Sequence, residues 1–313
     1  MLKKAILISI IIILLMFLLA RFQIYAPLST NSEEKVFRVE KGDGLGRISA
    51  NLEEHGFIRG DVFFNIYVYL QGKESVLKAG DYLLSSSISI KDIADKIIQG
   101  EEEGLKITII EGWDIKDIAE YFSDLNICSE EDFLQVTEGQ EGYLFPDTYK
   151  ITSTASPSDL VEIMRDNFEK KLSPKLRQEI EQQGKTIFEI VTMASIIEKE
   201  VRTLEDKKIV SDILWKRIGI NMPLQSCATI AYILRKKSTK ISVEETQIDS
   251  LYNTYKYVGL PIGPICSPSL ESIEAAIEPE ESPYWYYLST PEGKTIFNRT
   301  FKEHNIAKAK YLK

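Results

Sequence analysis

The sequence predicts an α+β protein, with a membrane helix at the N-terminus, one or two small α/β subdomains after it, and a larger mixed α+β domain at the end. Three observations support this class. Residues 5–20 are uncharged and apolar, a strand, glycine turn and helix recur between 36 and 170, and the helices that follow give way to short apolar runs separated by proline and glycine. A chain of 313 residues can hold two or three domains.

The composition narrows the classes of partner. With 44% hydrophobic and 27% charged residues the chain is typical of a well-folded protein. Its net charge of −9 argues against nucleic acid, because there is no basic surplus to replace counterions. Three cysteines and two histidines match no metal motif, so we expect no metal or other cofactor. Cys128, Cys227 and Cys266 are expected to be small buried residues and not a disulfide framework.

The N-terminal run predicts an uncleaved membrane anchor over residues 5–26. This segment can span a bilayer when its flanks extend into the interface, and residues 1–4 form a short tail. Lys3 and Lys4 keep this tail in the cytoplasm by the positive-inside rule, which places the rest of the chain outside the membrane. A secretory signal peptide is the alternative, but a cut at the end of the run would put Leu18 where a small residue is needed.

Two similar segments follow a polar linker at 27–35. The first, 36–103, opens with an alternating strand, a glycine turn and a helix with Leu45 and Leu52 on one face. The same plan recurs about seventy residues later, so 104–170 is a possible second copy of one strand-helix-strand-helix unit. The domains expected are therefore 36–103 and 104–313. The charged stretch 101–104 between them is a candidate hinge, and a solvated loop is the favoured alternative.

The first copy resembles the LysM module, which binds N-acetylated glycan chains. The resemblance rests on the strand and turn Val39-Glu-Lys-Gly-Asp-Gly-Leu45, and it is weaker beyond them, because Phe63–Leu70 is longer and more apolar than a minimal LysM helix requires. A LysM-like scaffold that binds no glycan is the alternative. The resemblance implies a glycan-binding subdomain at 36–103.

Helices are predicted at 174–183, 186–201 and 205–218, the last ending at Gly219, and a β-hairpin at 284–297. In the second helix Ile187, Ile190, Val191 and Ala194 form an apolar stripe, and Glu198 lies on this stripe. Burial raises the pKa of a carboxyl group, and a carboxyl that holds its proton near neutral pH can act as a general acid. A buried structural ion pair is the alternative role.

Two charged stretches near this helix are expected to face solvent. Glu200 lies well round the helix from Glu198 and, with Lys199, is predicted to be an ordinary surface charge. Residues 206–208 on the next helix, Asp-Lys-Lys, are likewise predicted to be solvated surface.

Three stretches combine glycine or proline with amides and tyrosines, as carbohydrate clefts do: 141–149, 223–229 and 252–268. Rigid loops hold polar groups in fixed positions, and tyrosine rings offer flat faces to sugars. The candidate substrate-binding residues in them are Glu141, Tyr143, Gln225, Asn253 and Tyr255.

At these residues the sequence resembles the MltG (YceG-like) family of endolytic murein transglycosylases. The matching motifs are Glu141-Gly-Tyr-Leu-Phe-Pro-Asp-Thr-Tyr149, Ala194-Ser-Ile-Ile-Glu-Lys-Glu200, Leu224-Gln-Ser226 with Thr229, Tyr252-Asn-Thr-Tyr255 with the Gly-Leu-Pro and Gly-Pro-Ile turns after it, and Phe297-Asn298 with Thr300 and His304-Asn305. They occur in order over about 105–313. Cys227 departs from the family, in which this position often carries Asp or another polar residue.

The resemblance implies a single-pass protein of the cell or inner membrane that cuts nascent peptidoglycan strands internally, between N-acetylmuramic acid and N-acetylglucosamine. The family's catalytic residue is the first glutamate of Ala-Ser-Ile-Ile-Glu-Lys-Glu, which is Glu198. It acts as general acid and then as general base, and it leaves a 1,6-anhydro end. Glycan strands, membrane lipid and peptidoglycan synthases are the partners implied.

Other classes of function remain open on the sequence. A muramidase-type hydrolase requires a second carboxylate, for which Glu141, Asp147 and Glu200 are candidates. A non-catalytic peptidoglycan-binding scaffold for wall synthases requires no acid. A pyridoxal-phosphate lyase is disfavoured, because Lys199 lies off the buried stripe and no glycine-rich phosphate loop accompanies it.

Overall fold

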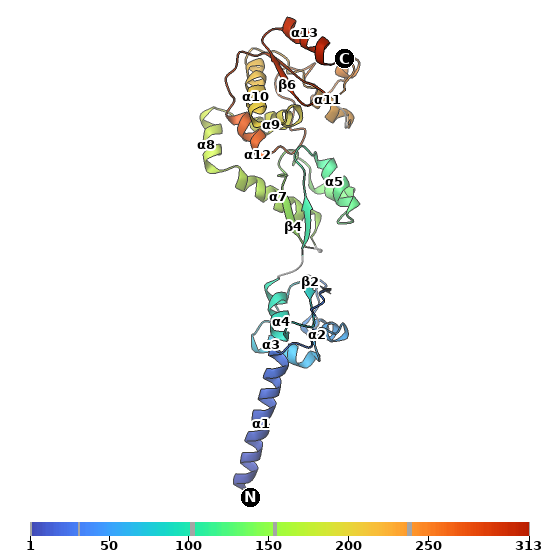
Figure 1. Cartoon of the computed structure of the whole chain (residues 1–313), viewed down its shortest axis with the longest axis vertical. Helices are drawn as coiled ribbons and strands as arrows, with labels where there is room; N and C mark the ends of the chain where they lie inside the picture. The colour runs from blue at the N-terminus through green and yellow to red at the C-terminus, as the bar shows by residue number, and fades with distance from the viewer. Residues whose placement is uncertain (1, 31, 101–103, 153–154, 237–239, 313) are drawn as a thin grey trace. The chain divides into compact units, whose positions relative to one another are not determined.

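The computed structural model describes residues 2–30, 32–100, 104–152, 155–236 and 240–312. The chain divides into two compact units (Figure 1). The first unit comprises 1–106 and 150–155, and the second comprises 107–149 and 156–313. Helices and two-stranded sheets are combined in this architecture, which confirms the predicted α+β class. The predicted boundary after residue 103 stays a prediction, and residues 101–103 of the predicted hinge lie outside the described residues.

The first helix is α1 (Leu2–Tyr25). It includes residues 2–4 of the predicted 1–4 tail, and Met1 lies outside the described residues. Residues Ile6–Tyr25 of this helix have a mean hydropathy of 2.6, and the segment is long and apolar enough to cross a membrane. An N-terminal signal sequence has the same length and hydropathy. The side chain of Ile24, in the last turn, is buried in the core of the first unit. The end of α1 is therefore part of this unit.

The first unit contains a two-stranded antiparallel sheet and three further helices. Its elements are β1 (Lys35–Val39), α2 (Leu45–Glu54), α3 (Asp61–Leu70), β2 (Gly80–Leu84) and α4 (Ile90–Gln99). Phe37 of β1 is opposite Tyr82 of β2, and both side chains are buried together with Ile93 and Ile97 of α4. The core of this unit thus lies between its sheet and its helices.

The following segment has the same order of elements. Its elements are β3 (Leu105–Thr108), α5 (Ile115–Asp124), α6 (Glu130–Val136), β4 (Thr148–Ile151) and α7 (Pro157–Lys171), and β3 pairs with β4. Both segments read strand, helix, helix, strand, helix, with one helix more than the predicted plan. In the second segment the additional helix begins at Ser129, whose hydroxyl accepts the Asp132 N–H as an N-cap.

The second unit is built around one central helix. The helices are α8 (Pro174–Gln182), α9 (Ile187–Glu200), α10 (Leu204–Gly219), α11 (Cys227–Leu234) and α12 (Leu270–Ile277), with a 3-10 turn η1 (Glu245–Gln247). A capping box between Thr186 and Glu189 fixes the start of α9. All residues from Ile190 to Ile197 are buried, because α8, α10, α11 and α12 all pack against α9.

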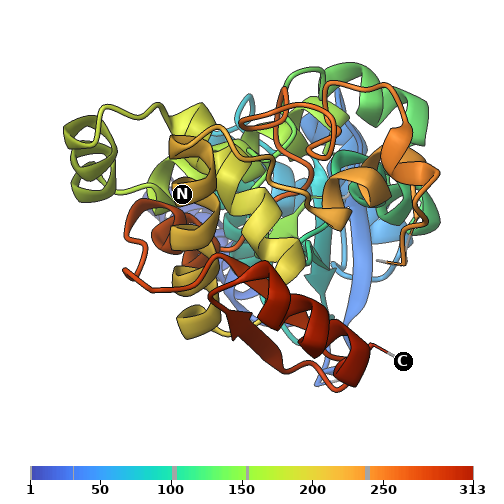
Figure 2. The same cartoon turned by 90° about the horizontal axis from the view of Figure 1, so that it is seen from above.

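A hairpin and a helix complete the chain. Strands β5 (Tyr286–Ser289) and β6 (Thr295–Asn298) pair antiparallel, and Figure 2 shows the dark red helix α13 (Phe301–Tyr311) beside them. The predicted hairpin and the three helices predicted between residues 174 and 218 agree with the structure to within two residues at each end, whereas α11, α12 and α13 were not predicted. One detail differs: Gly219 is the last residue of α10, and the left-handed turn after it is made by Asn221, with φ 57°.

Candidate active site

Glu198 lies at the end of α9 with its side chain turned inward, as the helical pattern predicts, and only 10% of that side chain is exposed. Its Oε2 atom accepts four hydrogen bonds. Three come from the Ser269 N–H at 3.0 Å, the Ser269 hydroxyl at 2.5 Å and the Ser272 hydroxyl at 2.6 Å. The fourth comes from Lys207 Nζ at 3.3 Å. Within the part of the chain that the structure describes, Oε1 accepts no hydrogen bond, which leaves this oxygen for a proton.

The two serines come together because Ser269 is the N-cap of α12. Its hydroxyl accepts the Ser272 N–H, and the spacing of three places both hydroxyls at the N-terminus of the helix. Free N–H groups and the helix dipole favour negative charge at such a position. The N-terminus of α12 therefore stabilises the carboxylate form of Glu198.

The predicted rise in the pKa of Glu198 is wrong. Burial raises this pKa, but the hydrogen bonds from Ser269 and Ser272 and the charge of Lys207 together lower it below the ordinary value. The prediction failed because a helical pattern reports burial alone, whereas the serine donors lie at the N-terminus of α12, 71 and 74 residues further along the chain. In the ligand-free protein at neutral pH, Glu198 is a carboxylate.

Lys207 corrects a second prediction. The stretch 206–208 was expected to be solvated, but the Lys207 side chain is 3% exposed and lies beside Glu198 and the Ser269 hydroxyl. The sequence carried a signal for this burial, since Lys207 lies on one face of α10 with the buried Val210 and Leu214. A lysine among apolar residues at this spacing indicates a buried charge partner.

Glu200 is not the surface charge that its place on the helix predicts. Its carboxylate accepts a hydrogen bond of 2.5 Å from the Ser226 hydroxyl. Burial raises its pKa and outweighs the lowering by Ser226, Tyr287 and Arg217. The prediction failed because later parts of the chain cover the side of α9 that an isolated helix would expose.

Glu111 is a nearby carboxylate that sequence reasoning missed. Its pKa is raised, first by partial burial and then by the negative charge of Glu198. Gly112, the next residue after Glu111, lies close to Glu198, since an added Cβ atom at Gly112 would lie 3.7 Å from Glu198 Cγ. Gly112 is held there by the hydrogen bond from its N–H to the Ser267 carbonyl oxygen, 2.9 Å long. A second acidic group therefore lies within electrostatic range of Glu198.

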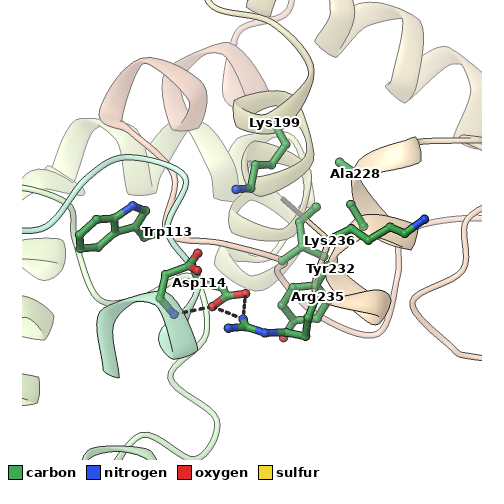
Figure 3. A pocket seen from close by; sticks show the side chains of 10 residues that line it. Trp113, Asp114, Lys199, Ala228, Tyr232, Arg235 and Lys236 are labelled. Atoms are coloured by element: carbon green, nitrogen blue, oxygen red, sulfur yellow. Dashed lines mark hydrogen bonds and ion pairs between the residues drawn. The ribbon is translucent and has the colours of Figure 1, made fainter. Parts of the chain in front are cut away.

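A cavity of about 350 Å³ lies beside this cluster. Figure 3 shows side chains from three parts of the second unit around it: Trp113 and Asp114, Lys199 at the end of α9, and Tyr232 and Arg235 at the end of α11. Asp117, Ala228, Ala231, Lys236 and Ile265 complete the lining. Glu198 does not line the cavity, but Lys199, the next residue in sequence, does, and so does Trp113, which follows Gly112.

Glu141 supports one wall of the cavity from behind. Its carboxylate accepts the Ile115 N–H at 3.3 Å and the Tyr232 hydroxyl at 3.2 Å. Burial, and then the charge of Asp114, raise its pKa to about 7. Asp114 in turn forms an ion pair of 2.5 Å with Arg235. These contacts show that Glu141 holds Ile115 and Tyr232 in place, while a direct contact of Glu141 with a substrate stays a prediction.

The other predicted binding residues have different surroundings. Asn253 is fully buried, and its Nδ2 donates to the carbonyl oxygens of Thr246 and Ile248 while its Oδ1 accepts the Tyr255 N–H. Its two amide protons are thus used within its own loop. The Tyr255 hydroxyl lies 3.0 Å from Cys227 Sγ, and burial raises the pKa of both groups.

Gln225 and Tyr143 differ in exposure. Gln225 is exposed and adopts a left-handed conformation with φ 53°. Tyr143 packs edge-to-face against Phe168 and lies under the guanidinium of Arg165, so its ring is committed to packing. Only Gln225 among the five candidates has an exposed side chain.

The candidate partner carboxylate Asp147 also has local partners. It accepts a hydrogen bond from the Asn167 amide and forms an ion pair with Lys171, and these lower its pKa. The carboxylate that responds to the charge of Glu198 is Glu111 and not Asp147. The three cysteines are free, and Cys266 is fully buried, its thiol donating to the Ser195 carbonyl oxygen.

Comparison with known proteins places the chain in a family. The model of the YceG-like family matches residues 37–310. The chain belongs to the YceG-like family. This YceG-like protein is 28% identical over 316 residues to a Bacillus subtilis protein named endolytic murein transglycosylase, covering 91% of this chain and 87% of that protein. A Streptococcus pneumoniae D39 protein of the same name is 30% identical over 332 residues.

The YceG-like protein spans only 60% of the length of the pneumococcal relative, although the match covers 91% of this chain. A crystal structure of a yceG-like protein from Listeria monocytogenes superimposes with a TM-score of 0.60 at 29% identity, over 89% of this chain and all of that one. The family resemblance of the sequence motifs is therefore confirmed.

Proposed function

We propose that this protein is a membrane-anchored endolytic lytic transglycosylase, which cuts nascent peptidoglycan strands between N-acetylmuramic acid and N-acetylglucosamine. One observation carries the proposal: Glu198 has one oxygen fixed by Ser269, Ser272 and Lys207 and the other left for a proton. A carboxyl group held in one orientation in this way can donate a proton in one step and accept a proton in the next. The names of the relatives support peptidoglycan as the substrate.

The reaction needs one carboxyl group. Protonated Glu198 gives the proton on Oε1 to the glycosidic oxygen while the bond from C1 of the muramoyl residue to that oxygen breaks. Its carboxylate then takes the proton from the C6 hydroxyl, whose oxygen bonds to C1. A 1,6-anhydro ring forms, no water is consumed, and the proton is back on Glu198. A bound glycan removes water from Oε1, and this desolvation favours the protonated form that the step requires.

Substrate contacts are proposed for the exposed Gln225 and for the ring of Tyr255. Asn253 assists by accepting the Tyr255 N–H and so fixing this residue. Glu141 and Tyr143 belong to the same proposed site, where they hold the cavity wall and the packing behind it. These assignments are supported by the position of each group around α9 and α11.

The proposed setting is a cell membrane, with α1 as a single-pass anchor, a cytoplasmic N-terminus and the catalytic unit outside. The apolar length of α1 supports the anchor. A LysM-like role in glycan binding is proposed for 36–103, supported by the strand and helix order around β1 and β2. Peptidoglycan synthases are the proposed protein partners, because nascent strands are their product.

The chemistry of the new chain ends tests the proposal. The full chain in detergent is incubated with uncrosslinked glycan strands, and the products are identified by mass spectrometry. Internal fragments that end in 1,6-anhydro-muramic acid are expected. Strands that stay bound but uncut would show a non-catalytic scaffold and would refute the proposal.

A hydrolase is the second candidate, because Glu111 responds to the charge of Glu198. Two carboxyl groups about 5–9 Å apart can hydrolyse a glycosidic bond with water. In that case the same experiment gives reducing ends that carry an added water, and a Glu111→Gln variant loses activity. With a lytic cut, Glu111→Gln keeps the anhydro products.

The serines at α12 are expected to set the pH dependence of cleavage. In Ser269→Ala and Ser272→Ala a donor to Glu198 is lost, so the pKa of Glu198 rises. Because the acid form starts the reaction, kcat/KM falls as pH rises above this pKa. We expect that fall to move to higher pH in each variant, because each serine hydroxyl stabilises the charged form of Glu198.

Ser267→Ala is the matched control for these variants. Ser267 is fully buried in the same loop, and its hydroxyl has no hydrogen-bond partner among the described residues. Its pH profile should equal that of the unmodified protein. An unchanged profile in both α12 variants would contradict the role of these serines.

A further inference from the structure

Helix α3 of the first unit exposes an apolar face. The exposed fractions are 58% for Val62, 40% for Ile66, 69% for Tyr69 and 77% for Leu70. Spacings of four, three and one residues place all four on one side of a helix. After Asp61, at its first position, the helix contains no charged residue. The solvent face of a soluble helix normally carries charges, so an uncharged apolar face indicates another environment.

The opposite face of α3 is firmly packed. Phe64, Tyr67 and Val68 are buried in the core of the first unit, and the Tyr67 hydroxyl donates to Asp95 of α4. The helix is therefore fixed in the fold, and its apolar face is a regular surface of the folded unit.

The position of α3 relative to α1 is defined by contacts inside the same unit. Ile24, in the last turn of α1, shares the core with Tyr67. Arg59, two residues before α3, lies over the Phe22 ring at 6.0 Å and donates to the carbonyl oxygens of Pro27 and Leu28. Figure 1 shows α3 at the upper end of α1, where that helix enters the unit.

We propose that this face of α3, formed by Val62, Ile66, Tyr69 and Leu70, is a second membrane contact that lies in the lipid interface. The inference rests on the proposed role of α1 as the membrane anchor. The apolar face of α3 continues the apolar surface of α1, because Phe22 and Tyr25, at the end of α1 that contacts α3, are 60% and 52% exposed. Tyrosine favours the boundary between acyl chains and headgroups, as Tyr25 and Tyr69 would occupy here.

The chemistry of the face also defines what kind of lipid contact it makes. Since Val62, Ile66, Tyr69 and Leu70 are uncharged, the contact depends on burial of apolar surface and not on anionic headgroups. It should be insensitive to salt, because only charge interactions are screened by ions.

Photo-labelling by lipid tests this contact. The full chain is reconstituted in phosphatidylcholine vesicles that contain a lipid with a diazirine on its acyl chain, irradiated, digested and analysed by mass spectrometry. We expect labelled peptides from α1 and from 62–70, equally at low and high salt, and none from α2, whose Arg47 and Glu54 face solvent. In the combined variant Ile66→Gln, Tyr69→Gln and Leu70→Gln, labelling of α3 should fall to the level of α2 while labelling of α1 persists.

The outcomes separate this inference from the anchoring on which it rests. Labelled α1 with α3 at the level of α2 would overturn the inference and leave the anchor intact. An unlabelled α1 would remove both. Labelling of α3 that appears only when the protein is highly diluted in lipid would mean that a second copy of the chain covers this face, which also overturns the inference. The substituted side chains are exposed, so the variant should keep the far-ultraviolet circular dichroism of the unmodified protein.

Discussion

Glu198→Gln is expected to lower the rate of glycan cleavage by about 10²–10⁴-fold, the usual contribution of a general acid or base. The amide oxygen of Gln can still accept the hydrogen bonds of Ser269 and Ser272, but the side chain has no acidic proton to give to the glycosidic oxygen. The loss should therefore appear in kcat, with binding of the strands retained. It is measured as the rate at which 1,6-anhydro ends form.

Glu200→Gln is the matched control, because it removes a carboxylate two residues away on the same helix. Its amide oxygen can accept the hydrogen bond of Ser226, so cleavage should continue. Glu198→Gln removes the charge that pairs with the buried Lys207, which then keeps only Ser269 and the more distant Glu271 as partners. The denaturation midpoints of both variants are therefore compared, to separate a loss of catalysis from a loss of stability. A folded Glu198→Gln protein that cleaves at the unmodified rate would contradict the assignment of the acid.

The second large effect is expected for the stability of the second unit in Glu141→Gln. The pKa of Glu141 is about 7 in the folded chain against an ordinary value of 4.5. Between these values the folded state holds a proton that the unfolded state has lost, so stability falls as pH rises from 4.5 through about 7. This difference corresponds to about 3 kcal/mol. Gln is neutral at every pH, so the variant should match the unmodified protein near pH 4 and exceed it at pH 8 by up to that amount.

Denaturant unfolding at several pH values measures this difference. Glu138→Gln is the control, because it removes an exposed carboxylate of the same loop and leaves the buried Glu141 in place. A Glu141→Gln difference that does not change with pH would mean that the carboxyl of Glu141 is ionised in the fold at no cost.

Local patterns were sufficient to predict helices α8, α9 and α10, the hairpin and the inward direction of Glu198, whereas α11, α12 and α13 were not predicted. Each correct prediction depends on residues within a few turns of one another, as with the stripe that joins Ile190 to Glu198. The surroundings of Glu198 could not be predicted in this way. Ser269 and Ser272 lie at the N-terminus of α12, more than seventy residues away, and together with Lys207 they reverse the direction in which burial alone moves the pKa of Glu198.

The errors on Glu200 and Lys207 have a common physical cause. Both residues were assigned to solvent because charged side chains usually are exposed, whereas other parts of the chain cover Glu200 at the end of α9 and α10 turns Lys207 toward Glu198. The partners that make this burial possible, Glu198 for Lys207 and Ser226 for Glu200, lie on other helices or at their ends and are not evident from the helix of each residue.

The burial of α9 also determines how the candidate site loses its structure. The backbone amides from Ile190 to Ile197 are sealed by the surrounding helices, so their hydrogens should exchange with solvent only when the second unit opens as a whole. Glu198 is attached to this sealed segment and has no separate local opening. Heat or denaturant should thus abolish activity and protection from exchange in one cooperative transition, without a folded but inactive intermediate.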